Sequence, residues 1–158
     1  MNRVYLLSGG VGSGKTTAIS EWIRSKNSVG GILQPVINGK RYLQDISTGE
    51  TRLLELTENI DKNDIISVGN YKFSGSVFNW AREKLISAFY TKPELLIIDE
   101  YGKLEINDRG LEPAISRIMN DLNDYQNINP VFIVRDYLVS EFLRKYRLNR
   151  NDIINLEI

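Results

Sequence analysis

A glycine-rich segment near the amino end constrains this chain more than any other stretch of it. Gly9 is followed by four residues and then by Gly14, Lys15 and Thr16, a spacing that fits the pattern G-x-x-x-x-G-K-[ST]. The apolar run at 4–7 indicates a buried strand before the segment, and helical spacing follows it. Only glycine cheaply takes the dihedrals that turn successive backbone N–H groups inward around oxyanions. The segment therefore predicts a strand–loop–helix unit that binds phosphate groups.

Each residue type in this loop has a chemical task at the phosphates of a nucleotide. Lys15 supplies a mobile cation for the β- and γ-phosphates and is a candidate catalytic residue, while the Thr16 hydroxyl is placed to ligate Mg²⁺. The helix that opens at Lys15 adds unpaired N–H groups and the positive end of its dipole. The residues expected to bind the nucleotide are Gly9, Gly10, Val11, Gly12, Ser13, Gly14, Lys15, Thr16 and Thr17.

The composition narrows the chemistry that is open to the chain. The 158 residues include no histidine and no cysteine, which excludes disulfides, a thiolate nucleophile and zinc–thiolate sites. A general base near neutral pH must then be a carboxylate, a lysine, a tyrosine or the substrate itself. Lys and Arg number 20, as do Asp and Glu, so the zero net charge gives no sign of a nucleic-acid or membrane-surface field.

The length and the apolar runs favour a cytoplasmic protein of one domain. The first predicted strand begins so close to Met1 that a signal peptide has no room. No apolar run approaches the roughly 18 residues that a membrane-spanning helix needs. The expected domain covers residues 1–158.

Strands and helices alternate at both ends of the chain. Wholly apolar runs predict buried strands at 95–98 and 131–134, and a short strand is expected at 153–156. Apolar residues at helical spacing predict helices at 15–26, 74–90, 111–122 and 138–146. This alternation predicts an α/β fold with a largely parallel sheet flanked by helices.

Residues 30–73 follow a different pattern, which predicts an antiparallel β-meander inserted into the α/β frame. Asn38-Gly39 is a strong hairpin signal between strand-like runs at 31–37 and 41–46. Pro35 fits poorly in a central strand, so the 31–37 strand is expected at an edge or with a bulge. Further short strands are expected at 51–56, 65–68 and 71–73.

A second half of the phosphate site is expected where the 95–98 strand ends. Asp99 follows its four apolar residues, and a carboxylate in that place can complete the Mg²⁺ shell begun by Thr16. Glu100 comes next and is the best-placed base to polarise a water for in-line attack on the γ-phosphorus. The metal ligands predicted are therefore Thr16 and Asp99, and Glu100 is a predicted catalytic residue.

Arg135, which follows the 131–134 strand, is the remaining catalytic candidate. Proteins with a glutamate after the strand-end aspartate usually place one strand between the P-loop strand and the aspartate strand. The 131–134 strand is the natural occupant, and it would bring Arg135 to the γ-phosphate side. Arg135 could equally pair with Asp99 or Glu100, or with Asp136 at a helix start.

The segment from Asp99 to Glu105 resembles the D-E-x-G-K-x-E signature of the thermophile nucleoside-triphosphatase family, which has a cancer-related vertebrate member. The similarity extends over 9–17, 30–50, 68–71, 95–105 and the strand that ends at Arg135. It implies a RecA-like P-loop protein that hydrolyses nucleoside triphosphates with broad base tolerance. By this resemblance the family's roles fall on Lys15, Thr16, Asp99 and Glu100, and its signature positions on Gly102, Lys103 and Glu105. Val134 stands where the family often has a histidine.

Two other functions fit parts of the sequence. A small-molecule or nucleotide kinase could use the basic cluster of Arg144, Lys145, Arg147 and Arg150 as a lid, although such runs are more often solvated helix faces. A GTP-dependent switch would explain Asp99-x-x-Gly102, but the N-K-x-D guanine motif is absent. The nucleoside triphosphate is the expected partner, no protein partner is indicated, and Glu100 favours hydrolysis.

Overall fold

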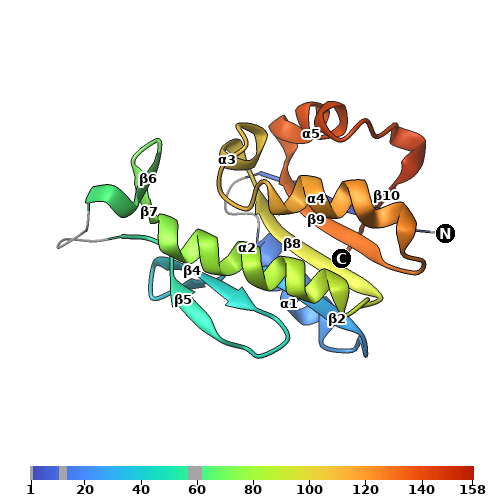
Figure 1. Cartoon of the computed structure of the whole chain (residues 1–158), viewed down its shortest axis with the longest axis horizontal. Coiled ribbons are helices and arrows are strands. Elements are labelled where there is room, and N and C mark those ends of the chain that lie inside the picture. The colour runs from blue at the N-terminus through green and yellow to red at the C-terminus, as the bar shows by residue number, and fades with distance from the viewer. Residues whose placement is uncertain (1, 11–13, 57–61) are drawn as a thin grey trace.

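A computed structural model describes residues 2–10, 14–56 and 62–158, in which an eight-stranded mixed sheet lies between helices (Figure 1). Seven strands follow one another in the order β10-β1-β9-β8-β2-β4-β3, and β5 pairs with β4. The five from β10 to β2 are mutually parallel. These are β1 (Val4–Gly9), β2 (Val29–Leu33), β8 (Leu95–Tyr101), β9 (Asn129–Arg135) and β10 (Ile153–Asn155). The expected α/β fold is confirmed, and β9 lies between β1 and β8 as expected.

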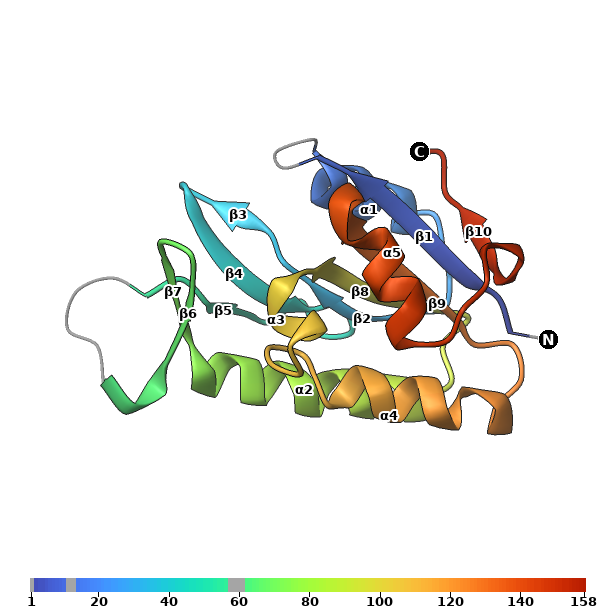
Figure 2. The same cartoon turned by 90° about the horizontal axis from the view of Figure 1, so that it is seen from above.

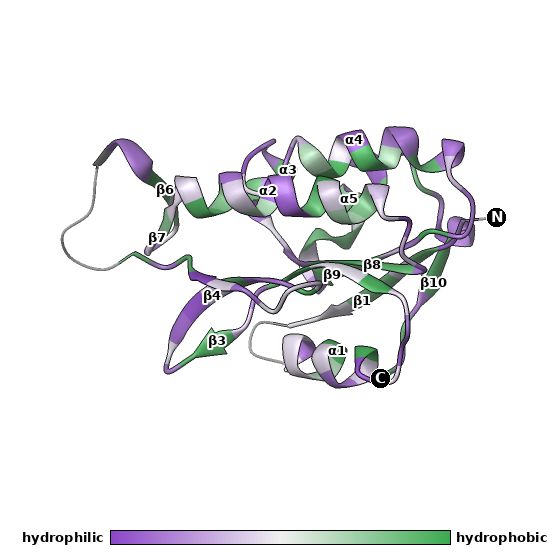
Figure 3. Ribbon diagram, turned by 60° about the horizontal axis from the view of Figure 1, so that its bottom comes forward, coloured by the Kyte–Doolittle hydropathy of each residue, from purple (hydrophilic) through white to green (hydrophobic). Residues whose placement is uncertain are grey.

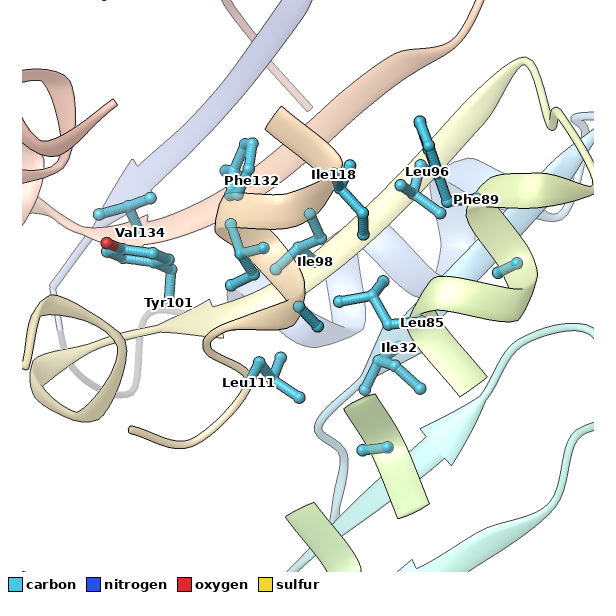
Figure 4. Packing of buried hydrophobic residues seen from close by; sticks show 14 of the residues in the cluster. Ile32, Leu85, Phe89, Leu96, Ile98, Tyr101, Leu111, Ile118, Phe132 and Val134 are labelled. Atoms are coloured by element: carbon cyan, nitrogen blue, oxygen red, sulfur yellow. The ribbon is translucent and has the colours of Figure 1, made fainter. Parts of the chain in front are cut away.

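Helices cover both faces of the sheet, which is why the central strands are apolar throughout. α1 (Lys15–Ile23) lies on one side, and α2 (Gly75–Tyr90), α4 (Ala114–Asp121) and α5 (Val139–Lys145) lie on the other (Figure 3). Two buried clusters result, a small one under α1 and a larger one under the other three helices. Figure 4 shows the larger cluster, where side chains of β8 and β9 meet those of α2 and α4. No helix in the described part of the chain is long and apolar enough to cross a membrane.

The short elements connect these layers. One α-helical turn, α3 (Lys103–Ile106), follows β8 directly. The described 3-10 turns are η1 (Lys62–Asp64), η2 (Leu122–Asp124), η3 (Asp136–Leu138) and η4 (Arg150–Asp152). The predicted helices are present, with α4 beginning at Ala114 rather than at 111. Pro113 occupies the N-cap position, and a proline disfavours the helical conformation in the residue before it. At the start of α2, the Ser74 hydroxyl accepts a hydrogen bond from the Val77 amide, as N-cap serines do.

The first strand of the antiparallel insertion is divided. The expected 31–37 strand is interrupted at Gln34-Pro35, and its first part belongs to β2, which pairs parallel with β8 on one side and antiparallel with β4 on the other. Proline cannot donate to a ladder and restricts the residue before it, so the strand is interrupted there, while the Pro35 carbonyl accepts a hydrogen bond from the Tyr42 amide at 2.9 Å and β3 continues the antiparallel pairing with β4. The antiparallel strands of the main sheet are β3 (Val36–Ile37), β4 (Lys40–Asp45) and β5 (Thr51–Leu53).

The remaining pair of predicted strands forms a separate hairpin. β6 (Ile65–Val68) and β7 (Tyr71–Ser74) pair only with each other as strands, in a second, two-stranded sheet. Figures 1 and 2 show this hairpin at the start of α2, at the end of the molecule where β3 and β4 lie. An isolated bridge between Glu55 and Phe73 links it to the segment after β5. The insertion therefore lies at the end of the sheet where β2 and β8 have their carboxyl ends.

Gly31 is the glycine that the packing of β2 against β8 requires. Its φ of 117° lies in a region that side-chain-bearing residues rarely adopt, and a Cβ atom there would stand 2.1 Å from the Ile97 carbonyl oxygen. The backbones of the two strands are thus closer at this point than any other residue would permit.

Candidate functional site

The turn from β1 into α1 carries the described part of the predicted phosphate-binding loop. Gly14 has a φ of 78°, and a Cβ atom added to it would meet no other atom within 4 Å, so its left-handed backbone rather than lack of space favours glycine. Lys15 is only 9% exposed, and its Nζ donates to the carbonyl oxygens of Gly9 at 3.2 Å and Gly10 at 2.7 Å. Three of the predicted phosphate-binding residues, Val11, Gly12 and Ser13, lie outside the described residues.

Asp99 and Thr16 lie together, as the metal-site prediction requires. Asp99 Oδ2 accepts hydrogen bonds from Thr16 Oγ1 at 2.8 Å and from the Gln34 amide at 2.9 Å, while its Oδ1 accepts from the Glu100 amide at 2.8 Å. The side chain is 1% exposed, and this burial raises the pKa of Asp99 to about 7 against the opposing effect of its hydrogen bonds. A cation would favour the ionised carboxylate by supplying the charge that burial removes.

The oxygen atoms at this point fit Mg²⁺ in number and kind. Mg²⁺ prefers one or two carboxylates, with substrate phosphates and waters filling the remaining positions, to a cage made of protein alone. Within residues 2–10, 14–56 and 62–158, no group of three or more acidic side chains is placed to hold a metal. One carboxylate and one hydroxyl beside the phosphate loop therefore match the smaller set that Mg²⁺ uses.

Glu100 lies on a bulge at the end of β8. Regular alternation along the strand would place its side chain on the face of Ile98, within the large apolar cluster. Instead the pairing of β8 with β9 shifts between Ile98 and Tyr101, and Glu100 adopts a φ of 55°. Tyr101 takes the buried place on that face, and the Glu100 carboxylate stays partly exposed. Bulges and left-handed non-glycine residues gather at sites where a side chain must be re-aimed.

Arg135 pairs with Glu100. Its Nη2 lies 3.6 Å from Glu100 Oε2, and both side chains remain partly exposed. The position follows from the register of the sheet, in which Arg135, the last residue of β9, pairs with Gly9 of β1. Of the three side chains predicted as partners of Arg135, Glu100 is the one with which the structure shows an ion pair. Asp136 instead accepts a hydrogen bond from the Tyr137 amide at the start of η3.

These residues border one cleft, which we call the P-loop cleft. It has a volume of about 470 Å³, and the predicted site residues that line it are Gly14, Lys15, Thr16, Thr17, Glu100 and Arg135. Asp99 lies beneath it through its bond to Thr16. The carboxyl ends of β1, β9, β8 and β2 meet here, at the edge where open parallel sheets bind ligands.

Gln34 and Arg41 line the same cleft, although neither was predicted from the sequence. The Gln34 amide also holds Asp99 in place. A signal was present, because Gln34 precedes a proline at the end of an apolar strand, and such strand ends carry ligand contacts in parallel sheets. This signal was overlooked because residues 31–37 were predicted to belong to an antiparallel insertion. No comparable signal marks Arg41.

The signature residues Gly102 and Glu105 organise the loop that follows β8. Glu105 is buried, its Oε1 accepts from the Gly102 amide at 2.9 Å, and its Oε2 accepts from the Leu111 amide at 3.0 Å. Burial raises the pKa of Glu105 to about 7. Since the Gly102 amide already donates to this carboxylate, it is not directed at the γ-phosphate as the glycine of a GTP switch would be.

The basic cluster at the end of α5 lies apart from the P-loop cleft. Lys145 pairs with Asp108 and, together with Arg147, lines a separate cavity of about 790 Å³ beside α4 and β10. Neither these two residues nor Arg144 and Arg150 line the P-loop cleft. The lid expected of a kinase is therefore not formed by this cluster in the described structure.

Comparison with known proteins gives consistent matches over nearly the whole chain. A family profile described as NTPase matches residues 4–157. The nucleoside-triphosphatase THEP1 of Thermotoga sp. (strain RQ2) is 27% identical over 157 residues, which cover 97% of this chain and 84% of that protein. Two solved structures share the fold.

The first of these structures is the crystal structure of THEP1 from the hyperthermophile Aquifex aeolicus, with a TM-score of 0.71 and 19% identity, covering 99% of this chain and 89% of that one. The second is the solution structure of a human cancer-related nucleoside triphosphatase, with a TM-score of 0.67 and 21% identity, covering 99% and 88%.

Proposed function

The chain belongs to the nucleoside-triphosphatase family, and on that premise we propose that it hydrolyses nucleoside triphosphates to the diphosphate and phosphate with Mg²⁺. We base this proposal on the placement of four residues. The hydrogen-bonded Thr16 and Asp99 lie beside the Glu100–Arg135 pair, at a cleft that begins on the phosphate loop. This arrangement joins oxygen ligands for a cation to a carboxylate that can accept a proton.

Thr16 and Asp99 would hold the Mg²⁺ ion, which neutralises charge on the β- and γ-phosphates when it is bound. Lys15 binds the same phosphates from the other side with its ammonium group, having exchanged the carbonyls of Gly9 and Gly10 for phosphate oxygens. The loop amides and the start of α1 bind the remaining oxygens. These contacts orient the γ-phosphorus toward Glu100.

Glu100 is the proposed general base. As a water oxygen forms its bond to the γ-phosphorus, one water proton passes to a Glu100 carboxylate oxygen and the bond to the bridging oxygen breaks. Arg135 first orients this carboxylate and then stabilises negative charge on the phosphoryl oxygens. The products are the nucleoside diphosphate and inorganic phosphate.

Broad base tolerance is part of the proposal. The residues assigned here act on phosphates, metal and water, and none of them is assigned to an edge of the base. We therefore expect ATP and GTP to be hydrolysed at rates within about one order of magnitude, since a site without base-edge hydrogen bonds discriminates weakly.

The experiment that tests the proposal is phosphate release from ATP, GTP, CTP and UTP, each with and without Mg²⁺. Turnover that needs Mg²⁺ and is lost in Lys15→Ala would support it. Lys26→Ala is the matched control, because that exposed lysine lies on the Trp22 ring and not at the cleft. Absence of phosphate release from all four nucleotides would refute hydrolysis, and transfer to an added acceptor would instead favour the kinase.

A further inference from the structure

A second cleft lies on the other side of the Glu100–Arg135 pair. Its volume is about 290 Å³, and it shares Gln34, Arg41, Glu100 and Arg135 with the P-loop cleft. The rest of its lining comes from the β6–β7 hairpin, the start of α2, the α3 loop and Tyr137 of η3. The two clefts therefore meet at the proposed general base but differ in all their other walls. Apart from the shared residues, the lining of the second cleft has no part in the proposed hydrolysis.

Two exposed aromatic rings stand on the walls of this second cleft. Tyr71 is 44% exposed, stacks on Phe73 with ring centroids 5.8 Å apart, and carries the Arg41 guanidinium 4.2 Å from its ring centroid. Tyr137 is 53% exposed, and Lys103 Nζ lies 6.0 Å from its ring centroid. Phe73 and Arg41 thus already lie against the Tyr71 ring, whereas Tyr137 is the more exposed ring. Open aromatic faces are the usual stacking partners of planar rings.

The charged groups of the second cleft leave it suited to an anion. It is lined by Arg41, Lys103 and Arg135 against the carboxylates of Glu100 and Glu105. Both Glu105 oxygens accept hydrogen bonds from backbone amides, Glu100 is paired with Arg135, and Arg41 is paired with Glu55 at 3.5 Å. In the part of the chain that the structure describes, no carboxylate lies within salt-bridge distance of Lys103. Lys103 is thus a cation beside an open ring, with its charge available to a ligand.

We propose that the second cleft binds a small anion that carries a planar ring, of the size of a nucleoside monophosphate, while the P-loop cleft holds a nucleoside triphosphate. The ring stacks on Tyr137, and the anionic group is bound by Lys103. A volume of about 290 Å³ lies at the lower limit of small-molecule sites, roughly 300–1,000 Å³, and accommodates one such molecule. The zero net charge of the chain argues against a polymer of phosphates as the ligand.

The test is calorimetric titration of the full chain with AMP, in the presence of Mg²⁺ and an excess of a non-hydrolysable ATP analogue that fills the P-loop cleft. Adenosine supplies the ring without the anion, and inorganic phosphate supplies the anion without the ring. We expect AMP to bind with a stoichiometry of one and both fragments to bind at least about tenfold more weakly, because each lacks one of the two contacts.

Two single substitutions locate the ligand. Lys103→Ala and Tyr137→Ala should each weaken AMP binding about tenfold or more and leave the affinity for the ATP analogue unchanged. Lys26→Ala and Tyr90→Ala are matched controls, since they remove an exposed lysine over a ring and an exposed tyrosine away from both clefts. The side chains of Lys103 and Tyr137 are both at the surface, so the circular dichroism spectra of these two variants should match that of the parent.

The proposal would be overturned if AMP failed to bind the analogue-loaded protein, if AMP and the analogue only displaced each other, or if both variants bound AMP as the parent does. Phosphate binding as tightly as AMP would also overturn it, because the rings would then play no part. None of these results would touch the hydrolysis proposal, which is read from phosphate release without AMP.

Discussion

The side-chain oxygen atoms of Thr16 and Asp99 lie next to each other. We predict that both residues determine the Mg²⁺ concentration that phosphate release needs. The 2.8 Å bond between Thr16 Oγ1 and Asp99 Oδ2 places a hydroxyl and a carboxylate where one cation can meet both. Thr16→Val and Asp99→Asn should each raise the Mg²⁺ concentration that gives half-maximal phosphate release, by about tenfold or more, because the oxygen contacts around a metal ion are worth that much.

The measurement is phosphate release over a range of Mg²⁺ concentrations at saturating ATP. Thr17→Val, the neighbouring threonine on α1, serves as a comparison for the loss of a hydroxyl from the same helix turn. A variant whose Mg²⁺ dependence matched that of the parent would remove the substituted residue from the metal site.

The raised pKa of the buried Glu105 allows us to predict how the free energy of unfolding depends on pH. Burial raises its pKa from 4.5 to about 7, so between these values the folded state binds more protons at this group than the unfolded state does. Its contribution to the free energy of unfolding is therefore fully present below about pH 4.5 and is lost as the pH rises to about 7. Glu105→Gln does not titrate and should show a smaller decrease in stability from pH 5 to pH 8.

Urea denaturation of the parent and Glu105→Gln at several pH values measures this difference. The exposed Glu141 on α5 gives the control Glu141→Gln, which should keep the pH dependence of the parent. Equal slopes for the parent and Glu105→Gln would mean that the carboxyl group does not hold a raised pKa.

The elements show which features the sequence could predict. Four apolar residues followed by Asp99 predicted a central parallel strand and the carboxylate at its end, because both depend on local pattern. The place of β9 between β1 and β8 was also predicted and is confirmed. The family resemblance, which rested on residues 99–105 and the phosphate loop, is confirmed as well.

Two features of the elements did not follow from the sequence. The bulge at Glu100 depends on the competition between Tyr101 and a carboxylate for one buried place, a tertiary effect that no local pattern encodes. The hairpin predicted around Asn38-Gly39 is confirmed, because residues of the 31–37 run pair antiparallel with β4. What the sequence did not show is that the first part of this run, in β2, also pairs parallel with β8. Only the Gln34-Pro35 dipeptide marks where the parallel strand ends. The second cleft escaped prediction because its walls come from four separate segments.

A substitution at Gly31 tests how closely the backbones of β2 and β8 approach each other. A Cβ at this position would meet the Ile97 carbonyl oxygen at 2.1 Å, and the φ of 117° would add backbone strain. Gly31→Ala should lower the free energy of unfolding by about 2–5 kcal/mol, from roughly 1–2 for the backbone and 1–3 for overpacking. Urea denaturation measures this loss.

Gly39→Ala is the matched control, because its φ is 78° but no atom lies within 4 Å of its Cβ position. It should lose only the backbone contribution, about 1–2 kcal/mol. Equal losses in the two variants would contradict the close packing of the strands.

At the scale of the whole molecule, we propose that residues 1–158 form one cooperative unit. The insertion contributes Leu43, Leu54 and Phe73 to the large apolar cluster, whose other side chains come from α2, α4, α5 and the central strands. Residues 28–74 expressed alone should therefore show no cooperative unfolding, because short strands without a covered apolar face are not stable in water. A sigmoidal urea transition of this fragment, monitored by circular dichroism, would contradict the proposal.

The parallel sheet brings the predicted phosphate loop, the proposed metal ligands and the proposed general base to one edge. Part of the lining of the second cleft comes from the insertion and η3. We therefore propose that a further ligand is to be sought there.

We propose that Glu100 accepts the proton of the attacking water, and the variant Glu100→Gln removes this function alone. The glutamine keeps the size of the side chain and most of its hydrogen bonding but removes the base. Single-turnover phosphate release and retention of ATP should be measured together, with Glu83→Gln on the exposed face of α2 as the control.

We predict that Glu100→Gln slows phosphate release by on the order of 10²–10⁴-fold, the usual worth of a positioned base. Its ATP affinity should be unchanged or higher, since a negative charge near the γ-phosphate is lost. The variant would then hold intact ATP in the presence of Mg²⁺. A decrease of less than about tenfold, smaller than general-base catalysis normally supplies, would contradict the account and exclude Glu100 as the base.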